Sequence, residues 1–275
     1  MSDTADDMHK AVLGISNADL LLLQQACEHL EHPSLAARLS SVVGTPIEVA
    51  LNLLPRRWFN GMHRAAEKGI AKALDSALSS MRREHESSAH EAYYKGLVAG
   101  SGALSGLVGL PGLLVELPVT TTLMLRAIAE IARDHGEDIH DEATRIACLE
   151  VFALGGRSEM DDAADTGYYG VRLALASYMT LSAVQVSHQS VLAEGPPMLV
   201  QLVQAIAVRF GRQLSTHAAA RVLPLISAAG SAAINTIFMQ HFQDMAHGHF
   251  TVRQLERKYG AELVRSNYER IARDL

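Results

Sequence analysis

The residues of this sequence that are best suited to chemistry are its histidines and two groups of charged side chains. His241, Asp244, His247 and His249 form the densest histidine cluster, in the segment QHFQDMAHGH. His241 and Asp244 are three residues apart and share a helix face, as metal ligands often do. No second ligand pair with a familiar spacing occurs elsewhere. We therefore expect solvated or capping histidines, and predict neither a metal site nor a cofactor.

The first charged group is a polar stripe on a helix that is otherwise apolar. Arg126, Glu130 and Asp134 recur at intervals of four residues, so their side chains share one face. Such a stripe is usual where one-turn side-chain pairs join a buried polar network. It would also suit a cavity that binds a polar ligand or a lipid headgroup, with Arg126 and Glu130 as binding residues.

The second charged group lies on a helix expected to begin near residue 161. Asp161, Asp165, Tyr169 and Arg172 follow a similar spacing and are the other candidate ligand-binding residues. An acidic residue near a helix N-terminus is favourable to the helix dipole, so Asp161 needs no further explanation. Arg172 lies about two turns further on, beside apolar neighbours. We predict that Arg172 pairs with Glu130 or Asp165 in a buried contact at the edge of a ligand cavity.

No catalytic motif accompanies these residues. The sequence has no glycine-rich phosphate loop after a strand, no nucleophile elbow and no kinase signature. Nothing in it requires catalysis, and a non-enzymatic role is favoured. A metal-dependent hydrolase built on the acidic residues 159–165 and nearby histidines is an alternative.

Composition narrows the class of protein. The chain has 275 residues, of which 48% are hydrophobic and 20% charged, and its net charge is −6. A dedicated nucleic-acid binder needs clustered Lys and Arg, so that class is disfavoured. Cys27 and Cys148 each lie in an apolar helical pattern and are expected to be buried, reduced thiols. The acidic N-terminus, MSDTADDMHK, is not a secretory signal, so we expect a cytoplasmic location.

The elements that position these residues are helices. Apolar periodicity is helical nearly throughout, and no segment shows sustained strand alternation. We predict a single all-α, multi-helix domain over residues 13–275, after a disordered acidic N-terminus of residues 1–12. The expected helices include a long amphipathic one over residues 57–83, one capped by Asp141, one opened by Pro196 and Pro197, a short one capped by Ser215, and two short charged helices in 251–275.

Two runs without charge are the most unusual feature of the sequence. The first, GLVAGSGALSGLVGLPGLLVELP (96–118), has no charge up to residue 115, and the second is VLPLISAAGSAAINTIFMQHFQ (222–243). About 20 apolar residues suffice for a helix to cross a bilayer. Pro111 and Pro118 interrupt the first run, which favours a helical hairpin with arms from Ala92 to Val108 and from Leu113 to Arg133. Such a hairpin would form part of the core or enter one leaflet.

Small residues in both runs predict close helix packing. A glycine inside a helix in water costs about 0.8–1.0 kcal/mol relative to alanine, so several of them require a packing reason. Asn235 and His241 would be costly against lipid and are expected in the protein interior, with hydrogen-bond partners. The residues expected at helix contacts are Gly96, Gly100, Gly102, Gly106, Gly109, Gly112, Ser227, Ser231 and Asn235.

Four segments resemble the EcsC-like protein family. They are LVGLPGLLVELPVTTTLMLRAIAEIARDHGED (107–138), CLEVFALGG (148–156), TGYYGVRLALA (166–176) and LPLISAAGSAAINTIFMQHFQDMAHGHFTVRQLERKYG (223–260). The resemblance covers roughly residues 45–270, although LISAAGSAAIN carries less glycine than the family tends to. It implies a helical, membrane-associated bacterial protein. The family is named after the third product of an operon whose other products form an ABC transporter, so a transporter component is a candidate partner.

Together these features lead us to expect a membrane-associated binding or adaptor protein, partly peripheral to the inner face of the bacterial cell membrane. Its partner would be the membrane surface or an apolar ligand. The long helix could rest on anionic lipid. An alternative is a soluble carrier that holds an apolar or lipid ligand between the two uncharged runs. The basic residues available to the long helix are Arg56, Arg57, Arg64, Lys68, Lys72, Arg82 and Arg83.

Overall fold

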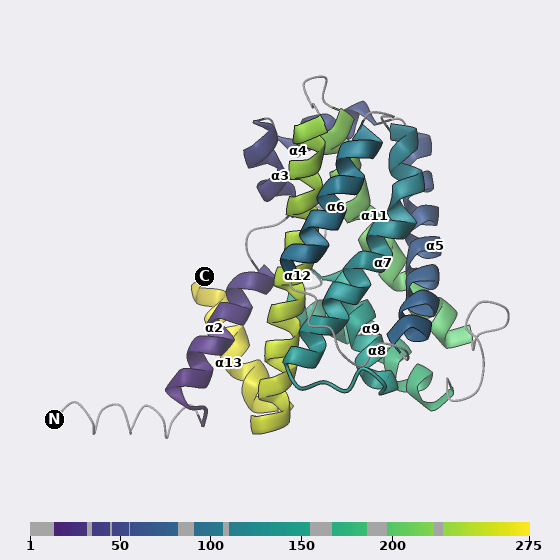
Figure 1. The fold of residues 1–275 in the computed structure, drawn as a ribbon. Coiled ribbons are helices and arrows are strands. Elements are labelled where there is room, and N and C mark those ends of the chain that lie inside the picture. Colours follow the sequence, from purple (N-terminus) through teal and green to yellow (C-terminus); the bar gives the residue numbers. More distant parts are fainter. Residues whose placement is uncertain are drawn as a thin grey trace.

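The protein is all-α, as predicted (Figure 1). The computed structural model describes residues 14–31, 35–44, 46–54, 56–81, 91–106, 110–154, 167–185, 197–222 and 228–275, and none of these is in a strand. Their elements are α2 (Asn17–Glu31), α3 (Leu35–Val43), α4 (Ile47–Leu53), α5 (Arg56–Met81), α6 (Glu91–Gly106), α7 (Leu110–Asp134), α8 (Glu142–Glu150), the 3-10 turn η1 (Val151–Ala153), α9 (Tyr168–Gln185), α11 (Pro197–Val222), α12 (Ala228–Tyr259) and α13 (Ala261–Asp274).

The long helix α12 is the centre of the bundle. It packs against α6, α2, α7, α13 and α3, and its 32 residues make it about 48 Å long at 1.5 Å per residue. α5 packs along both α7 and α11. The long helices run in roughly the same direction, while α2 and α13 pack beside the lower half of α12 in Figure 1. Residues from many parts of the chain are therefore brought together along α12.

Short sequence signals set several helix ends. Ser16 Oγ accepts a hydrogen bond from the backbone N–H of Asp19 (3.2 Å), so Ser16 caps α2. Pro46 directly precedes α4, and Pro197 is the first residue of α11. Gly260 separates α12 from α13 with a φ of 89°, a left-handed conformation that favours glycine.

Two expected helix boundaries are wrong. Ser215 lies inside α11 and caps nothing, because its hydroxyl donates to the carbonyl oxygen of Gly211 one turn earlier (2.9 Å). The charged segment 251–259 is the last part of α12 and not a separate helix. It contains neither glycine nor proline, so no local signal stops the helix before Gly260. Asp141 stands at the N-cap position of α8 as expected, without a side-chain capping bond.

The predicted helical hairpin is confirmed. α6 and α7 pack against each other, and Gly106 and Leu110 end and begin the two arms. Pro111 lies in the first turn of α7. A backbone N–H in the first turn has no acceptor within the helix, so a proline there breaks no hydrogen bond. Pro118 lies inside α7, and the hydroxyl of Thr122 donates to the Pro118 carbonyl oxygen (2.8 Å). The second arm therefore continues as one helix through its proline.

The core is apolar and contains both cysteines. Phe152 of η1 packs against Phe210 of α11 and Phe242 of α12, with ring centroids 4.8 and 5.5 Å apart. Cys27 and Cys148 are free thiols and buried, as predicted. Burial raises the pKa of Cys148 to about 12, so this thiol stays protonated and unreactive near neutral pH.

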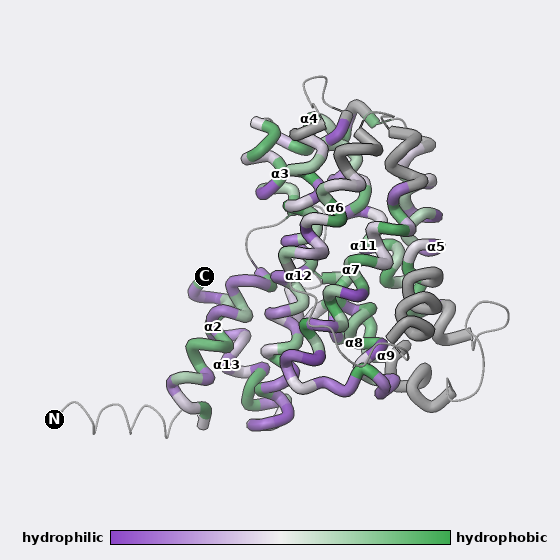
Figure 2. Tube along the Cα trace, viewed as in Figure 1, coloured by the Kyte–Doolittle hydropathy of each residue, from purple (hydrophilic) through white to green (hydrophobic). Residues whose placement is uncertain are grey.

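Polarity is distributed unevenly along the bundle. Hydrophilic residues gather on α13 and on the segment between α7 and α8 (Figure 2). The two runs without charge lie towards the opposite end, where α6 meets α7 and α11 meets α12 (Figure 1). The bundle therefore has a polar end and an apolar end, and α12 reaches both.

Glycines serve opposite purposes on two helices. A Cβ at Gly248 of α12 would lie 2.7 Å from Leu30 Cγ and 3.0 Å from the carbonyl oxygen of Ala26, so α12 and α2 approach closely there. A Cβ at Gly96 or Gly100 of α6 would meet nothing within 4 Å, and both residues are exposed. The expectation that these two α6 glycines make helix contacts is wrong, because they lie on the outward face of α6.

Of the other small residues expected at helix contacts, Ser231 and Asn235 are buried in α12, which agrees with that expectation. Gly102, Gly106 and Gly112 belong to α6 and α7, but their surroundings lie outside what the structure describes. Gly109 and Ser227 lie outside the described residues altogether.

This contrast predicts opposite effects of one substitution. Gly248→Ala should lower the free energy of unfolding by about 1–3 kcal/mol, because the new Cβ overlaps a backbone oxygen that cannot move freely. Gly100→Ala should raise it by up to about 1 kcal/mol, because alanine favours the helix and has free space. Urea denaturation of both variants measures the difference, and equal stabilities would contradict the assigned contacts.

Candidate functional site

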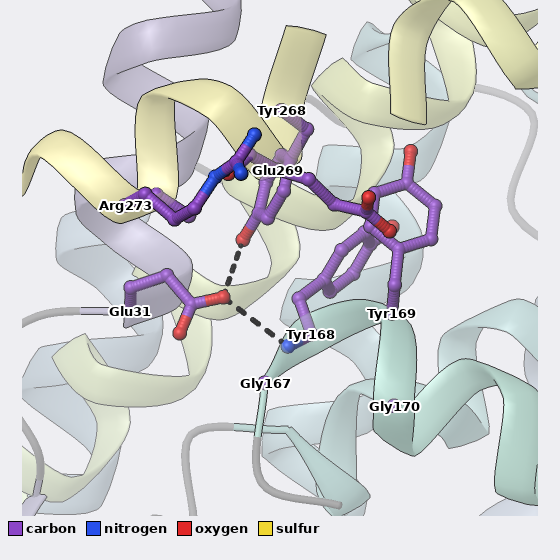
Figure 3. Close-up of a pocket in the computed structure, with 9 residues that line it drawn as sticks. Glu31, Gly167, Tyr168, Tyr169, Gly170, Tyr268, Glu269 and Arg273 are labelled. Carbon is purple, nitrogen blue, oxygen red and sulfur yellow. Dashed lines mark hydrogen bonds between the residues drawn. The ribbon is translucent and has the colours of Figure 1, made fainter. Parts of the chain in front are cut away.

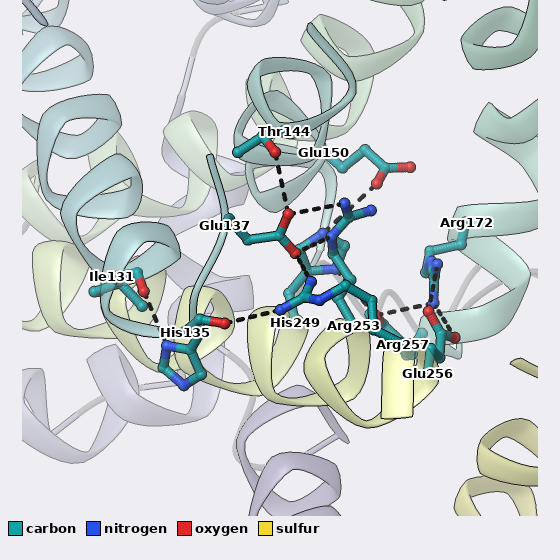
Figure 4. Close-up of polar contacts among 11 residues, drawn as sticks. Ile131, His135, Glu137, Thr144, Glu150, Arg172, His249, Arg253, Glu256 and Arg257 are labelled. Carbon is teal, nitrogen blue, oxygen red and sulfur yellow. Dashed lines mark hydrogen bonds and ion pairs between the residues drawn. The ribbon is translucent and has the colours of Figure 1, made fainter. Parts of the chain in front are cut away.

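A cluster of charged and polar side chains lies around the C-terminal half of α12 (Figure 4). We call it the polar cluster. α12 contributes four of its members, and α8, α9 and the segment after α7 contribute the others. The members are Glu137, Thr144, Glu150, Arg172, His249, Arg253, Glu256 and Arg257.

Glu137 joins the segment after α7 to α12. Its carboxylate accepts hydrogen bonds from Arg253 Nε (2.9 Å) and Nη2 (3.2 Å), from Arg257 Nη1 and from the hydroxyl of Thr144 (3.1 Å). Burial raises the pKa of Glu137, but the hydrogen bonds and charge of Arg253 outweigh it and leave the pKa below its ordinary value. Glu137 is thus ionised and bound by two guanidinium groups. The sequence did not indicate this residue as part of a site.

Arg172 is paired, as predicted, but its partner is Glu256 of α12. Its Nη1 and Nη2 donate to the two carboxylate oxygens at 2.7 and 3.0 Å, and the hydroxyl of Tyr169 donates to Glu256 Oε1 (3.0 Å). The prediction of Glu130 as the partner is wrong. The other predicted partner, Asp165, lies outside the described residues. α9 begins at Tyr168 and not near residue 161, where the helix was expected to begin. The bidentate pair fixes α9 against α12.

Glu150 and His249 face each other in the interior. Glu150 Oε2 and His249 Nε2 are 3.6 Å apart, and both side chains are at most 1% exposed. Neither Glu150 oxygen has a hydrogen-bond partner among the described residues. Burial raises the pKa of Glu150 to about 7 and lowers that of His249 well below its ordinary value. His249 Nδ1 shares a hydrogen bond with the hydroxyl of Tyr168 (3.0 Å), which also accepts one from Arg172.

A pocket of about 420 Å³ opens next to this cluster, where α2, α9 and α13 meet (Figure 3). Glu31 ends α2 in its wall, and Glu31 Oε1 accepts hydrogen bonds from the backbone N–H of Tyr168 (3.2 Å) and the hydroxyl of Tyr268 (2.9 Å). Tyr169, one of the predicted ligand-binding residues, also lines it. The tyrosine pair in TGYYG was visible in the sequence, whereas Glu31 and Tyr268 gave no local signal.

Among the described residues, the pocket at α2, α9 and α13 is lined by Tyr169 of the second polar stripe and by no residue of the first. Glu130 of α7 accepts a hydrogen bond from the hydroxyl of Tyr94 of α6 (2.6 Å), and its partly buried carboxyl has a raised pKa because of desolvation. Arg126 lies one turn earlier on the same helix. Asp161 lies outside the described residues.

A second buried polar group lies between the two uncharged runs. Arg221 Nη1 donates to Glu116 Oε2 (3.0 Å), and the side chains of this pair are each 5% exposed. Asn235 donates from Nδ2 to Glu116 Oε1 and to the carbonyl oxygen of Val98 (2.9 Å), and accepts from His217 Nε2 (2.8 Å). The expectation that Asn235 has interior partners is confirmed. These bonds join α6, α7, α11 and α12.

The histidine cluster of α12 has no shared centre. Among the described residues, no group of three or more His, Cys, Asp or Glu side chains is placed to hold a metal ion. Asp244 instead accepts hydrogen bonds from Arg38 and Gln240. His241 is buried, but neither of its ring nitrogens has a hydrogen-bond partner in the described part of the chain, contrary to expectation.

The apolar end of the bundle combines three features (Figure 1). We define it as the end of α6 at Gly106, the start of α7 at Leu110, the end of α11 at Val222 and the start of α12 at Ala228, together with α4 and the first turn of α5. Residues 96–115 and 222–240 carry no charge. α4 and α5 add Val49, which is 52% exposed, and Phe59, which is 40% exposed. Arg56 and Arg57 precede Trp58 in the first turn of α5.

A comparison with known protein families identifies the family of this chain. The family described as the EcsC protein family matches residues 23–255. The chain belongs to the EcsC protein family. The match begins in α2 and ends in α12, so it includes the hairpin, the apolar end and most of the polar cluster of this EcsC protein. Comparison with curated proteins and with solved structures gave no significant match.

The Arg172–Glu256 pair predicts a large and specific loss of stability. Arg172→Ala should lower the free energy of unfolding by roughly 3 kcal/mol, the lower end for a broken buried pair, because Glu256 would keep its charge without its bidentate partner. Arg133→Ala, at an exposed position of α7, is the matched control and should change stability by less than about 0.5 kcal/mol. Equal melting temperatures for the two variants would contradict the pair.

The raised pKa of Glu150 predicts a pH-dependent stability. Between about pH 4.5 and 7 the folded protein binds a proton at Glu150 that the unfolded chain releases, so stability should fall as pH rises. Titration of Glu150 should lower the free energy of unfolding by about 3 kcal/mol between these two pH values. Glu150→Gln removes the titration, so the difference in unfolding free energy between the variant and the wild type isolates it. A difference that is constant with pH would contradict the raised pKa.

Proposed function

We propose that this EcsC-family chain docks its apolar end on the inner face of the bacterial cell membrane and acts as a binding or adaptor protein for a transporter or envelope system. One observation supports the proposal above the others. The two long stretches without charge, which are far apart in the sequence, meet at one end of the bundle (Figure 1). Arg56, Arg57 and Trp58 begin α5 at that same end.

The chemistry of this end suits an anionic lipid surface. Uncharged stretches at the helix ends can enter the boundary between headgroups and acyl chains. The ionised Glu116–Arg221 pair near this end is already buried in the protein, so docking would not have to desolvate it. Trp favours the headgroup level of a bilayer, where Trp58 would lie. Phe is typical of the apolar face of an interfacial helix, which suits Phe59. Basic residues contribute about 1 kcal/mol each beside anionic lipid. No helix in the described part of the chain is both long enough and apolar enough to cross a membrane.

The packing of α5 favours docking through the end of the bundle over docking along the helix. Met62, Ala66 and Ile70 of α5 are buried, and the helix packs along α7 and α11. A membrane lying along the outer face of α5 would meet Arg64 and Lys68. In that orientation the uncharged helix ends would run parallel to the membrane surface and would not enter the membrane. Docking through the apolar end brings the uncharged runs and the first turn of α5 to the lipid together.

The alternative of a lipid carrier needs space between the two uncharged runs. Where the structure describes both runs, α6 and α12 are in direct contact, and Asn235 of α12 donates to the carbonyl oxygen of Val98 of α6. The Glu116–Arg221 pair lies beside this contact. A buried ion pair there is a poor lining for an acyl chain, so membrane docking is our first proposal.

Charge reversal at the apolar end tests the proposal. The double variant Arg56→Glu and Arg57→Glu should bind vesicles containing phosphatidylglycerol at least tenfold more weakly than the wild type. Each arginine contributes about 1 kcal/mol to binding anionic lipid, and a loss of about 1.4 kcal/mol weakens binding tenfold. Lys68→Glu, exposed in the middle of α5, is the matched control and should bind almost normally. Vesicle sedimentation at low salt measures all three.

Two outcomes would contradict docking through the apolar end. One is a wild-type protein that does not bind phosphatidylglycerol vesicles. The other is an equal loss of binding in Lys68→Glu, which would instead place the long face of α5 on the lipid. In cells the protein should be found partly in the membrane pellet and be released by carbonate at high pH. Complete resistance to carbonate would indicate segments that span the bilayer.

A further inference from the structure

The pocket at α2, α9 and α13 has a composition of its own. Three tyrosine rings, Tyr168, Tyr169 and Tyr268, pack against one another with centroids 5.0 to 5.3 Å apart. They line a space of about 420 Å³, which is within the range of small-molecule sites. The rings come from two helices that are distant in sequence, α9 and α13. Their contacts hold both helices in place and give the pocket a rigid aromatic wall.

The aromatic wall already attracts cations of the protein itself. The guanidinium carbon of Arg172 lies 5.3 Å from the centroid of Tyr168 and 5.5 Å from that of Tyr169. Arg265 lies 5.6 Å from the centroid of Tyr169. Aromatic faces bind ammonium groups through the same attraction, and groups of aromatic side chains are the usual way to recognise quaternary ammonium. Arg172 and Arg265 show that rings of this wall accept a cationic group, and the Glu31 carboxylate beside Tyr268 supplies the negative charge for one in the pocket.

The charged residues of the pocket are of both signs. Glu31 is 8% exposed, and the backbone N–H of Tyr168 and the hydroxyl of Tyr268 hold its carboxylate in the wall. Arg273 lies at the exposed rim, where its Nε donates to the carbonyl oxygen of Glu269 (3.1 Å) and so fixes the direction of the side chain. A ligand that used the whole pocket would meet the Glu31 carboxylate in the wall and the Arg273 guanidinium at the rim (Figure 3). Glu269 also lines the pocket, but its carboxylate is paired with Arg265 (2.7 Å).

We propose that this pocket binds a small zwitterion, with its ammonium group against the tyrosines and Glu31 and its anionic group at Arg273. The ligand class is a molecule with an ammonium and a phosphate or carboxylate a few bonds apart. Such a group occurs free in solution and as the headgroup of zwitterionic lipids. This inference does not depend on the proposed docking of the apolar end.

Calorimetric titration of the full-length protein tests the proposal with four probes. Phosphoethanolamine and phosphocholine carry both charges, whereas tetramethylammonium carries only the cation and inorganic phosphate only the anion. At least one zwitterion should bind one-to-one, and each single-charge probe should bind at least about tenfold more weakly. The proposal is overturned if neither zwitterion binds the folded protein, or if inorganic phosphate or tetramethylammonium binds as well as the zwitterions.

Two variants assign the two charges. Glu31→Gln keeps an acceptor for Tyr168 and Tyr268 but removes the negative charge, and Arg273→Gln removes the positive charge at an exposed position. Each should weaken zwitterion binding about tenfold or more, and the exposed control Arg133→Gln should not. If Glu31→Gln fails to fold, Arg273→Gln decides, because its exposed side chain leaves the core unchanged. Unaltered affinity in Arg273→Gln overturns the assignment.

A competition experiment distinguishes the two sources of the ligand. Vesicles of phosphatidylethanolamine should displace bound phosphoethanolamine if the pocket takes a lipid headgroup, and should not if it takes the free molecule. The double variant Arg56→Glu and Arg57→Glu should retain its affinity for soluble phosphoethanolamine. Loss of that affinity in a folded double variant would show that the pocket does not act as the separate site proposed.

Discussion

The fold depends on one constraint, which is that polar side chains inside a helical bundle must find partners, and α12 carries many of them. Asn235 bonds to α6 and α7, Asp244 to α3 and Arg253 to the segment after α7. Apolar packing tolerates changes of the packed side chain, whereas a hydrogen bond or ion pair requires a partner atom at one position. A shift of one turn would break all these bonds and leave buried charges unpaired, which costs several kcal/mol each. The polar contacts thus fix the register of α12.

This constraint also separates what the sequence could predict from what it could not. The cap at Ser16, the α6–α7 hairpin and the buried thiols follow from signals within a few residues. The partner of Arg172 does not, because Glu256 is 84 residues away and spacing shows only which face a residue occupies. The end of α11 was missed for a related reason. Ser215 satisfies its hydroxyl within the helix, so a residue type that often caps gave a false boundary.

Glycine patterns were ambiguous in the same way. Gly96 and Gly100 have the spacing of a packing face, yet they are exposed. Gly248 is not part of such a pattern, but a Cβ there would lie 2.7 Å from Leu30, so α12 and α2 are in close contact at this glycine. The pocket shows the complementary limit. Its tyrosine pair stands out in the sequence, but Glu31 is 137 residues from Tyr168 and 237 from Tyr268, so only folding reveals the carboxylate among the rings.

The two ends of the bundle respond to different variables. Residues 96–115 and 222–240 contain no ionisable side chain that titrates near neutral pH, so pH leaves the charge of those runs unchanged. Glu150 and the pocket at α2, α9 and α13 lie at the polar end. Tyr168 connects them, since it shares a hydrogen bond with His249, which faces Glu150, and also lines the pocket. Protonation of Glu150 and occupancy of the pocket therefore act on the same junction of α8, α9 and α12. α12 reaches both this junction and the apolar end, through which we propose that the protein docks, and its polar contacts fix its register along the whole bundle.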